Sequence, residues 1–506
     1  MKKPPKKRAP IPNYVSKNQL VLEGFESPFE KKLNSDNRWV ILANLIPWDE
    51  ICNIYRKAIP KSTTGRPGLN PRIVLGSIII KHLCDIDDRE TVSQISENIY
   101  MQYFLGYSSF SDEAPFDASL FVEFRKQLGM DVINEINEKI VDLKTKLEQK
   151  NAPKAENKDQ GPDEKNNNKG QVIMDATACP QDIAYPTDLN LLHDAREKSE
   201  MLIDRLYNKE LHEKKPRCYR EKARKLYLHT AQRKSKTGKI IRKGVGEQLR
   251  FLKRNIKFLH SLLDKYEAIP LEKSELKYLY VIQTLFEQQE LMFKTKTKIV
   301  EHRIVSIHQP HVRPIVRGKS QSKVEFGAKI HCSLVDGIVF LDELSWDAFN
   351  EGSHLMEYIE IYKRRFGFYP KELLADKIYC TRANRAALKE KEILLIAKPL
   401  GRPKLAAQIV VSPGERNPIE GKFGQAKTGY GLDRIKARLQ NTSESWIASI
   451  FLVLNLVKLA GVALPCFIFQ MLKSIKANFI EKSTFKINVI DLTGNYTSRH
   501  RILWEF

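Results

Sequence analysis

Three acidic residues stand where carboxylates could do chemistry. Asp175 ends the apolar run VIMD, Asp376 ends ELLAD, and Glu420 lies in RNPIEGKFGQAK, where a helix is expected to begin. Carboxylates at strand ends point into the crevice where α/β proteins bind ligands. Three converging carboxylates would hold two divalent metals, and two such ions about 4 Å apart promote phosphoryl transfer by activating a nucleophile and stabilising the leaving oxygen.

This chemistry needs Asp and Glu because magnesium prefers oxygen ligands, some of them from the phosphate itself. An Asp after an apolar strand is also a common turn or helix-cap residue, so none of the three identifies a site alone. The histidines at 308, 311, 331 and 354 fit no zinc-ligand spacing. A GxxxxGK[ST] phosphate loop does not occur, so no nucleotide cofactor is expected.

The elements that would position these carboxylates follow an α/β pattern. After residue 171, strand-like runs (QVIMDATA, VEFGAKIHCSLV, IVFLDEL, ELLAD, EILLIAK) are interleaved with helical ones (SHLMEYIEIYKRRFG, TRANRAALKEK). Such alternation predicts helices packed around one sheet. Residues 195–300 differ, because Leu249, Leu252, Ile256, Leu259 and Leu263 repeat at helical spacing and a further helix is expected over 273–293. This segment is predicted to be helical and charged.

The N-terminal part is predicted to be helical. Residues 60–148 contain several short apolar-periodic segments, among them one with Pro71 at its first turn and another, FDASLFVEFRKQLG. Residues 150–170 are polar and are interpreted as a linker. The apolar stretch 446–472 contains Lys458 and Pro465, so it is interpreted as a buried core helix followed by a second apolar segment, and no membrane association is expected.

Composition indicates a polyanionic partner. The 506 residues include 84 Lys and Arg against 61 Asp and Glu, a net charge of +23. That excess is spread along the chain and favours nucleic acid over a merely soluble basic protein. The seven cysteines lie far apart without a CxxC pair, which fits a reducing cytoplasm.

Several blocks of the sequence, in order, resemble a DDE-type insertion-sequence transposase of the insertion-sequence-five group. GLNPRIVLGSIIIKHL, QYFLGY and FVEFRKQLG resemble its N-terminal helical domain, and VIMDATACPQDIAYPTDLNLL resembles the block around the first Asp. VEFGAKIHCSLVDG, YKRRFGFYPKELLADKIYCTRANR and RNPIEGKFGQAKTGYGLDRI resemble the remaining catalytic blocks. The resemblance spans about residues 60 to 460.

The resemblance implies a ribonuclease-H-like catalytic fold whose DDE triad is Asp175, Asp376 and Glu420, binding Mg²⁺ or Mn²⁺. The family places an Arg four residues before the Glu and a Lys seven after it, here Arg416 and Lys427, and both would contact DNA phosphate. The family's Tyr, three before the Arg, is replaced by Pro413. Arg317 and Lys329, in the basic region 312–330, are further DNA-binding candidates.

The expected fold is therefore an all-α N-terminal domain, followed by an α/β ribonuclease-H-like catalytic domain with a charged helical insertion. We divide the chain into an N-terminal helical DNA-binding domain, a polar linker, a catalytic domain and a C-terminal tail, at residues 1–150, 151–170, 171–475 and 476–506. The insertion, about 195–300, is expected to bind DNA, to contact a second subunit, or to be a solvated helical hairpin. A helix-turn-helix in the N-terminal domain is one arrangement that the sequence leaves open.

The expected function is cut-and-paste DNA transposition in a prokaryotic cytoplasm, in association with the nucleoid. The family implies binding to double-stranded transposon ends and target DNA, and a homodimer that joins two ends in a synaptic complex. Two alternatives stay open. One is a catalytically inactive DNA-binding regulator of transposition, and the other is a ribonuclease-H-like nuclease without strand transfer.

Overall fold

The computed structural model describes residues 33–59, 68–151, 168–316, 324–397, 414 and 416–461, with the side chains of 143–151 excepted. Every element below lies within one compact unit, Met1–Ala460. The predicted division into four segments stays a prediction.

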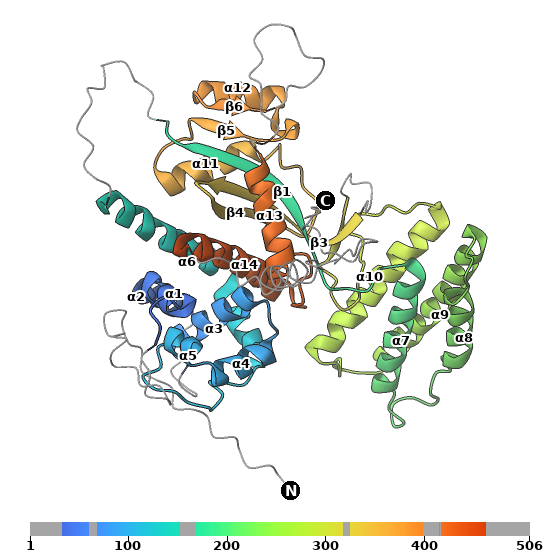
Figure 1. Ribbon diagram of the computed structural model, residues 1–506. Coiled ribbons are helices and arrows are strands. Elements are labelled where there is room, and N and C mark those ends of the chain that lie inside the picture. Colours follow the sequence, from blue (N-terminus) through green and yellow to red (C-terminus); the bar gives the residue numbers. More distant parts are fainter. Residues whose placement is uncertain are drawn as a thin grey trace, which may run out of the picture. The chain divides into compact units, whose positions relative to one another are not determined.

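A mixed sheet is formed after residue 170 (Figure 1). Its strands are β1 (Gln171–Pro180), β2 (Arg313–Val316), β3 (Val324–Val335), β4 (Ile338–Ser345), β5 (Glu372–Leu374) and β6 (Leu394–Ile396). The order is β2-β3-β1-β5-β6, and β4 also pairs with β3. Strand β3 runs antiparallel to β1, β2 and β4, whereas β1, β5 and β6 are parallel to one another.

Two of these strands are joined by a turn that the sequence itself specifies. Asp336 and Gly337 connect β3 to β4, and both have positive φ, 51° and 80°. Positive φ at both central residues is the requirement of a two-residue hairpin turn whose twist matches that of the strands, and Asp-Gly is one of the pairs that satisfy it. The turn sets the β3–β4 register, in which Val335 faces Ile338.

One face of the sheet is covered by α11 (Leu355–Phe366) and α12 (Arg382–Glu390). Val172 and Met174 of β1 belong to the same apolar cluster as Leu355 and Ile359 of α11. Side chains alternate along a strand, so Asp175 projects to the opposite face. There α13 (Asn417–Tyr430) contacts β1.

Only helices occur as regular elements in the described residues before β1. They are α1 (Arg38–Leu45), α2 (Trp48–Ala58), α3 (Pro71–Cys84), α4 (Asp88–Glu97), α5 (Ile99–Leu105) and α6 (Leu120–Asn151). Helix α3 begins at Pro71 as predicted, with the Asn70 side chain accepting a hydrogen bond from the Arg72 N–H. The short helix expected in FDASLFVEFRKQLG is the first part of α6, which ends at a break at Gly129, whose φ is 48°, and a second helical part continues to Asn151.

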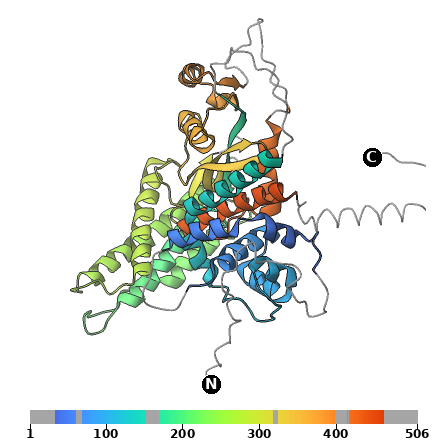
Figure 2. The same ribbon diagram turned by 90° about the vertical axis from the view of Figure 1, so that its left-hand side faces the viewer.

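The C-terminal apolar run forms α14 (Gln440–Ala460), which packs against α6 and β4 (Figures 1 and 2). Among the described helices, only α14 is long and apolar enough to span a membrane, and 78% of its most apolar window is buried inside the protein. This confirms the prediction of a buried core helix. The second apolar segment that was expected after it lies outside the described residues.

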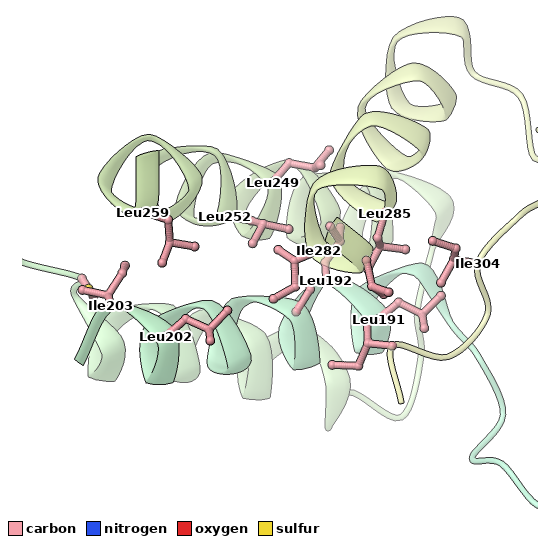
Figure 3. Packing of buried hydrophobic residues seen from close by; sticks show 14 of the residues in the cluster. Leu191, Leu192, Leu202, Ile203, Leu249, Leu252, Leu259, Ile282, Leu285 and Ile304 are labelled. Atoms are coloured by element: carbon pink, nitrogen blue, oxygen red, sulfur yellow. The ribbon is translucent and has the colours of Figure 1, made fainter. Parts of the chain in front are cut away.

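The charged insertion is a four-helix block between β1 and β2. It consists of α7 (Asp188–Leu206), α8 (Arg220–Ala231), α9 (Gly238–Leu263) and α10 (Lys273–Thr295). It begins at Asp188, earlier than the expected residue 195. Leucine and isoleucine side chains of α7, α9 and α10 meet in an apolar core of their own (Figure 3), so the helices predicted around 249–263 and 273–293 are confirmed.

Candidate active site

Asp175 and Asp376 come together through the pairing of β1 with β5. The two strands are parallel, and Ile173 lies opposite Leu374. Asp175 follows Ile173 by two residues within β1, and Asp376 follows Leu374 by two residues, just beyond the end of β5. The two aspartates therefore occupy matching positions on neighbouring strands. Strand β1 does not end at Asp175, as its sequence context predicted, because β1 stays paired with β3 as far as Pro180. The pairing of β1 with β5, by contrast, ends at Ile173, before Asp175.

Both aspartates are held by local backbone geometry. Asp376 caps the 3-10 helix η3 (Lys377–Tyr379), where its Oδ1 accepts a hydrogen bond of 2.7 Å from the Lys377 N–H. Asp175 accepts one of 2.8 Å from the Ala176 N–H. The Asp175 side chain is 20% exposed and that of Asp376 is 50% exposed, so the pair lies at the border between the sheet and solvent.

Helix α13 brings the other predicted residues to this edge. It buries an apolar stripe at helical spacing, formed by Ile419, Phe423, Ala426 and Tyr430. Glu420 lies in its first turn and Arg416 immediately precedes it, as the sequence predicted. Arg416 bridges the two aspartates: Nη2 lies 3.2 Å from Asp175 Oδ2, and Nη1 lies 3.3 Å from Asp376 Oδ1.

The pKa of Asp175 responds to the charges of Asp376, Glu420 and Arg416. Burial is the main cause that raises the pKa of Asp175 above its ordinary value, and the negative charges of Asp376 and Glu420 raise it further. The Ala176 N–H and the Arg416 guanidinium act in the opposite direction. Glu420 therefore lies close enough to Asp175 to interact with its charge. Asp175 and Asp376 meet at the Arg416 guanidinium. Glu420 lies near enough for its charge to act on Asp175, but the three carboxylates do not form a metal-binding group among the described residues.

Tyr379 lies next to this site, in the short helix that Asp376 caps, and packs in the apolar cluster with α11; sequence reasoning assigned it no role. It is fully buried in η3, and its hydroxyl has no hydrogen-bond partner among the described residues. Its pKa is raised mainly by burial, and also by the charges of Glu351 and Asp175. The Nε of Arg416 is likewise buried without a partner there. Buried polar groups are normally hydrogen-bonded, so the Tyr379 hydroxyl and the Arg416 Nε are exceptions among the described residues. The sequence around Tyr379 contains no signal that distinguishes it from a core tyrosine.

The donor set fits a hard divalent cation in kind, because it consists of carboxylates without His or Cys. Among the described residues, no three potential ligand side chains lie close enough to hold a metal ion. The Arg416 guanidinium lies between two of the carboxylates. The structure thus shows two carboxylates whose charges are compensated by one arginine.

The remaining DNA-binding candidates are distributed differently. Lys427 lies on α13, half-buried and two helical turns after Glu420, on the same side of the helix. Lys329 forms an ion pair with Glu351 and donates to the Phe349 carbonyl oxygen at 2.7 Å, and only 17% of its side chain is exposed. Its ammonium group is therefore engaged within the protein. Arg317 and Pro413 lie outside the described residues.

Comparison with known families bears directly on this site. The family described as "Transposase domain (DUF772)" matches residues 27–127, and the family described as "Transposase DDE domain" matches residues 373–457. The chain is also 31% identical over 173 residues to the "Uncharacterized protein ORF8 in nfe locus" of Rhizobium meliloti, over 33% of this chain and 73% of that protein. The chain belongs to the DDE transposases.

The match to the transposase DDE domain covers Asp376, Arg416, Glu420 and Lys427. Asp175 lies outside both matched segments. A DDE transposase domain implies a ribonuclease-H-like α/β fold, and the mixed sheet with helices against it agrees with that. No solved structure matches the chain.

Proposed function

We propose that this transposase catalyses cut-and-paste DNA transposition, with Asp175, Asp376 and Glu420 as its metal-binding carboxylates. The observation that supports this is the matching position of Asp175 on β1 and Asp376 just after β5, two adjacent parallel strands. Glu420 lies in the first turn of α13, where its charge acts on Asp175. Residues 201 apart in the sequence meet at one sheet edge, and each is a carboxylate.

Water would attack a phosphodiester at the transposon end and release a 3′-hydroxyl, which would then attack target DNA in strand transfer. Bound Mg²⁺ or Mn²⁺ would supply nucleophile activation and charge neutralisation in a two-metal site. Asp175, Asp376 and Glu420 would hold the ions. Arg416 would leave the aspartates for a DNA phosphate, for which a guanidinium is geometrically suited, and Lys427 would contact phosphate as a point charge.

The remaining assignments follow from the same proposal. On its sequence resemblance we assign the enzyme to the insertion-sequence-five group, and its N-terminal helical domain would bind terminal inverted repeats through backbone contacts and base readout. Two ends must be brought together, so a homodimer in a synaptic complex is expected. Its substrate would be DNA in the cytoplasm.

The test is cleavage of a labelled duplex that carries the element's own terminal repeat, with Mg²⁺ or Mn²⁺. Wild type is compared with Glu420→Gln and Asp376→Asn, which keep side-chain shape while removing a charge. Glu357→Gln, at an exposed position on α11, is the matched control. We expect nicking and joined products from wild type and the control alone.

Other outcomes separate the alternatives. DNA binding without cleavage by any variant would support a catalytically inactive regulator. Nicking without joined products would support a nuclease that lacks strand transfer. Equal cleavage by wild type and both carboxylate variants would show that the active site is elsewhere.

A further inference from the structure

The composition was interpreted as a charge excess spread along the chain, but a count by segment shows that more than half of it lies in part of the helical block. Residues 207–257 contain eighteen Lys and Arg against four Asp and Glu, a net charge of +14 out of the whole chain's +23. About a tenth of the sequence thus holds more than half of the charge excess. Such a concentration points to a polyanion.

Within this segment, α9 divides into two opposite sides. Its apolar side includes Leu249, Leu252 and Leu259, which point into the core shared with α7 and α10 (Figure 3). On the opposite side, four cations are spaced by four, seven and seven residues, a pattern that keeps them in one line along a helix. They are Lys239, Lys243, Arg250 and Lys257, all exposed, and we call them the α9 cationic stripe.

The stripe is about 27 Å long, since eighteen residues separate its ends and each adds about 1.5 Å. Close packing behind the stripe makes α9 a rigid support. The Gly244 position of α9 lies against Thr230 of α8, where an added Cβ would come within 2.9 Å of the threonine side chain. Gln248 also donates a hydrogen bond of 3.0 Å to the Ala223 carbonyl oxygen of α8.

None of the four stripe cations forms an ion pair with an acidic side chain of the described chain, whereas cations elsewhere on the same helices are engaged. Lys253 pairs with Glu290 at 2.9 Å, and Arg220 pairs with Asp204 at 2.7 Å. Uncompensated like charges at neighbouring helical positions destabilise a helix slightly and increase self-repulsion of the folded state. The stripe therefore does not serve stability.

We propose that the α9 cationic stripe binds the phosphate backbone of double-stranded DNA, as a contact separate from the carboxylate site. The inference rests on the proposed function insofar as DNA is the substrate. Phosphate contacts of this kind position a duplex without reading its sequence. A second copy of the chain would present the same positive charge, so it does not suit this surface.

The test measures how the affinity of the full-length protein for a duplex depends on salt. The stripe variant carries Lys239→Gln, Lys243→Gln, Arg250→Gln and Lys257→Gln together. The duplex lacks terminal-repeat sequence, and the Asp376→Asn background keeps it uncut. Each phosphate contact contributes about 0.9 to the slope of log affinity against log salt concentration. We expect the magnitude of the slope to fall by about three to four in the stripe variant.

The matched control removes four exposed lysines that lie in the same block or just after it, outside α8 and α9: Lys265→Gln, Lys273→Gln, Lys277→Gln and Lys298→Gln. It should keep the wild-type slope, and both variants should unfold at the wild-type temperature. Equal slopes in the stripe variant and wild type would overturn the inference, as would an equal loss in the control.

The result is independent of the carboxylate test. A normal slope in the stripe variant, with nicking that still depends on Glu420, would refute the stripe and leave the proposed active site intact. A reduced slope, with cleavage unaffected by Glu420→Gln, would refute the active site and leave the stripe standing.

Discussion

Arg416 and Asp175 form an ion pair across the start of α13 and the middle of β1, with Nη2 and Oδ2 3.2 Å apart. The same guanidinium reaches Asp376 through its other terminal nitrogen. A cation that binds between the two aspartates must therefore displace this guanidinium. The arginine stabilises two facing carboxylates in the absence of another cation, and its departure would free it for a DNA phosphate.

Removing that guanidinium should tighten metal binding in the absence of DNA. We expect Arg416→Gln to bind Mn²⁺ more tightly than wild type, because the ion no longer competes with an internal cation. The increase in melting temperature on adding Mn²⁺ should be correspondingly larger, while cleavage of the terminal-repeat duplex falls. Weaker Mn²⁺ binding in Arg416→Gln would instead mean that the arginine organises the ligands. Arg364→Gln, at an exposed position on α11, serves as the control.

Tyr379→Phe should separate stability from activity. The wild-type hydroxyl is buried without a hydrogen-bond partner among the described residues, so its removal should raise the free energy of unfolding by about 1 kcal/mol. If that hydroxyl serves a water or phosphate bound beside Asp175, cleavage should fall in the same variant. Denaturant unfolding and the nicking assay measure the two effects. A loss of stability would show that the hydroxyl is satisfied in the folded protein.

Lys81 should make stability depend on alkaline pH. It is 2% exposed, and burial lowers its pKa from 10.5 to about 8, while the charge of Asp88 opposes that shift. Between these two values the unfolded chain binds more protons than the folded one, so the free energy of unfolding should rise with pH over this window. The contribution is on the order of 3 kcal/mol at most.

The measurement compares wild type with Lys81→Met by denaturant unfolding at pH 7.5 and pH 10. The change with pH should be more favourable to the folded state in wild type than in the variant. Other groups titrate in this range in both proteins, so the difference isolates Lys81. An identical pH dependence in the two proteins would contradict the lowered pKa.

Asn455 should be essential for the attachment of α14 to the edge of the sheet. Its side chain accepts a hydrogen bond of 2.9 Å from the Val339 N–H and donates one of 2.6 Å to the Val339 carbonyl oxygen, and it also donates to Asn137 of α6. Asn455→Leu has a similar size but leaves these buried groups unpaired, and we expect a loss of roughly 2–4 kcal/mol.

Denaturant unfolding checks this loss against Ser449→Ala, a buried control on the same helix. Within the described part of the chain, its hydroxyl bonds only the Ser445 carbonyl oxygen one turn earlier. That control should lose less than about 1 kcal/mol. If the two variants lost the same amount, the hydrogen bonds of Asn455 to β4 would contribute nothing specific.

Two lysines predicted to bind DNA should behave differently. Lys329→Met leaves the carboxylate of Glu351, 14% exposed, without its ion-pair partner, so we expect the free energy of unfolding to fall by about 2 kcal/mol.

Lys427→Gln should instead lower the magnitude of the slope of log DNA affinity against log salt concentration by about one. Unfolding and DNA titration on both variants check this. A Lys329→Met protein of normal stability with a reduced slope would restore Lys329 as a DNA contact.

Local patterns in the sequence were sufficient for much of the fold. Pro71 predicted where α3 begins, the leucine spacing predicted α9, and the polar groups within the apolar stretch predicted that α14 is a core helix. Each of these depends on neighbours a few residues away, which is why a single sequence contains the information. The triad itself came from strand-end context together with the resemblance to transposases.

Other features depended on contacts between distant segments. Asp175 lies within a strand because its antiparallel partner β3 extends the pairing to Pro180, and it lies beside Asp376 because β1 and β5 share a register. Arg416 was predicted to face DNA, and only the packing of α13 on β1 shows it between two aspartates. The sequence by itself determined which side chains are carboxylates, cations and helix formers. The tertiary structure decided which of them meet, because register and packing bring together residues that no local pattern connects.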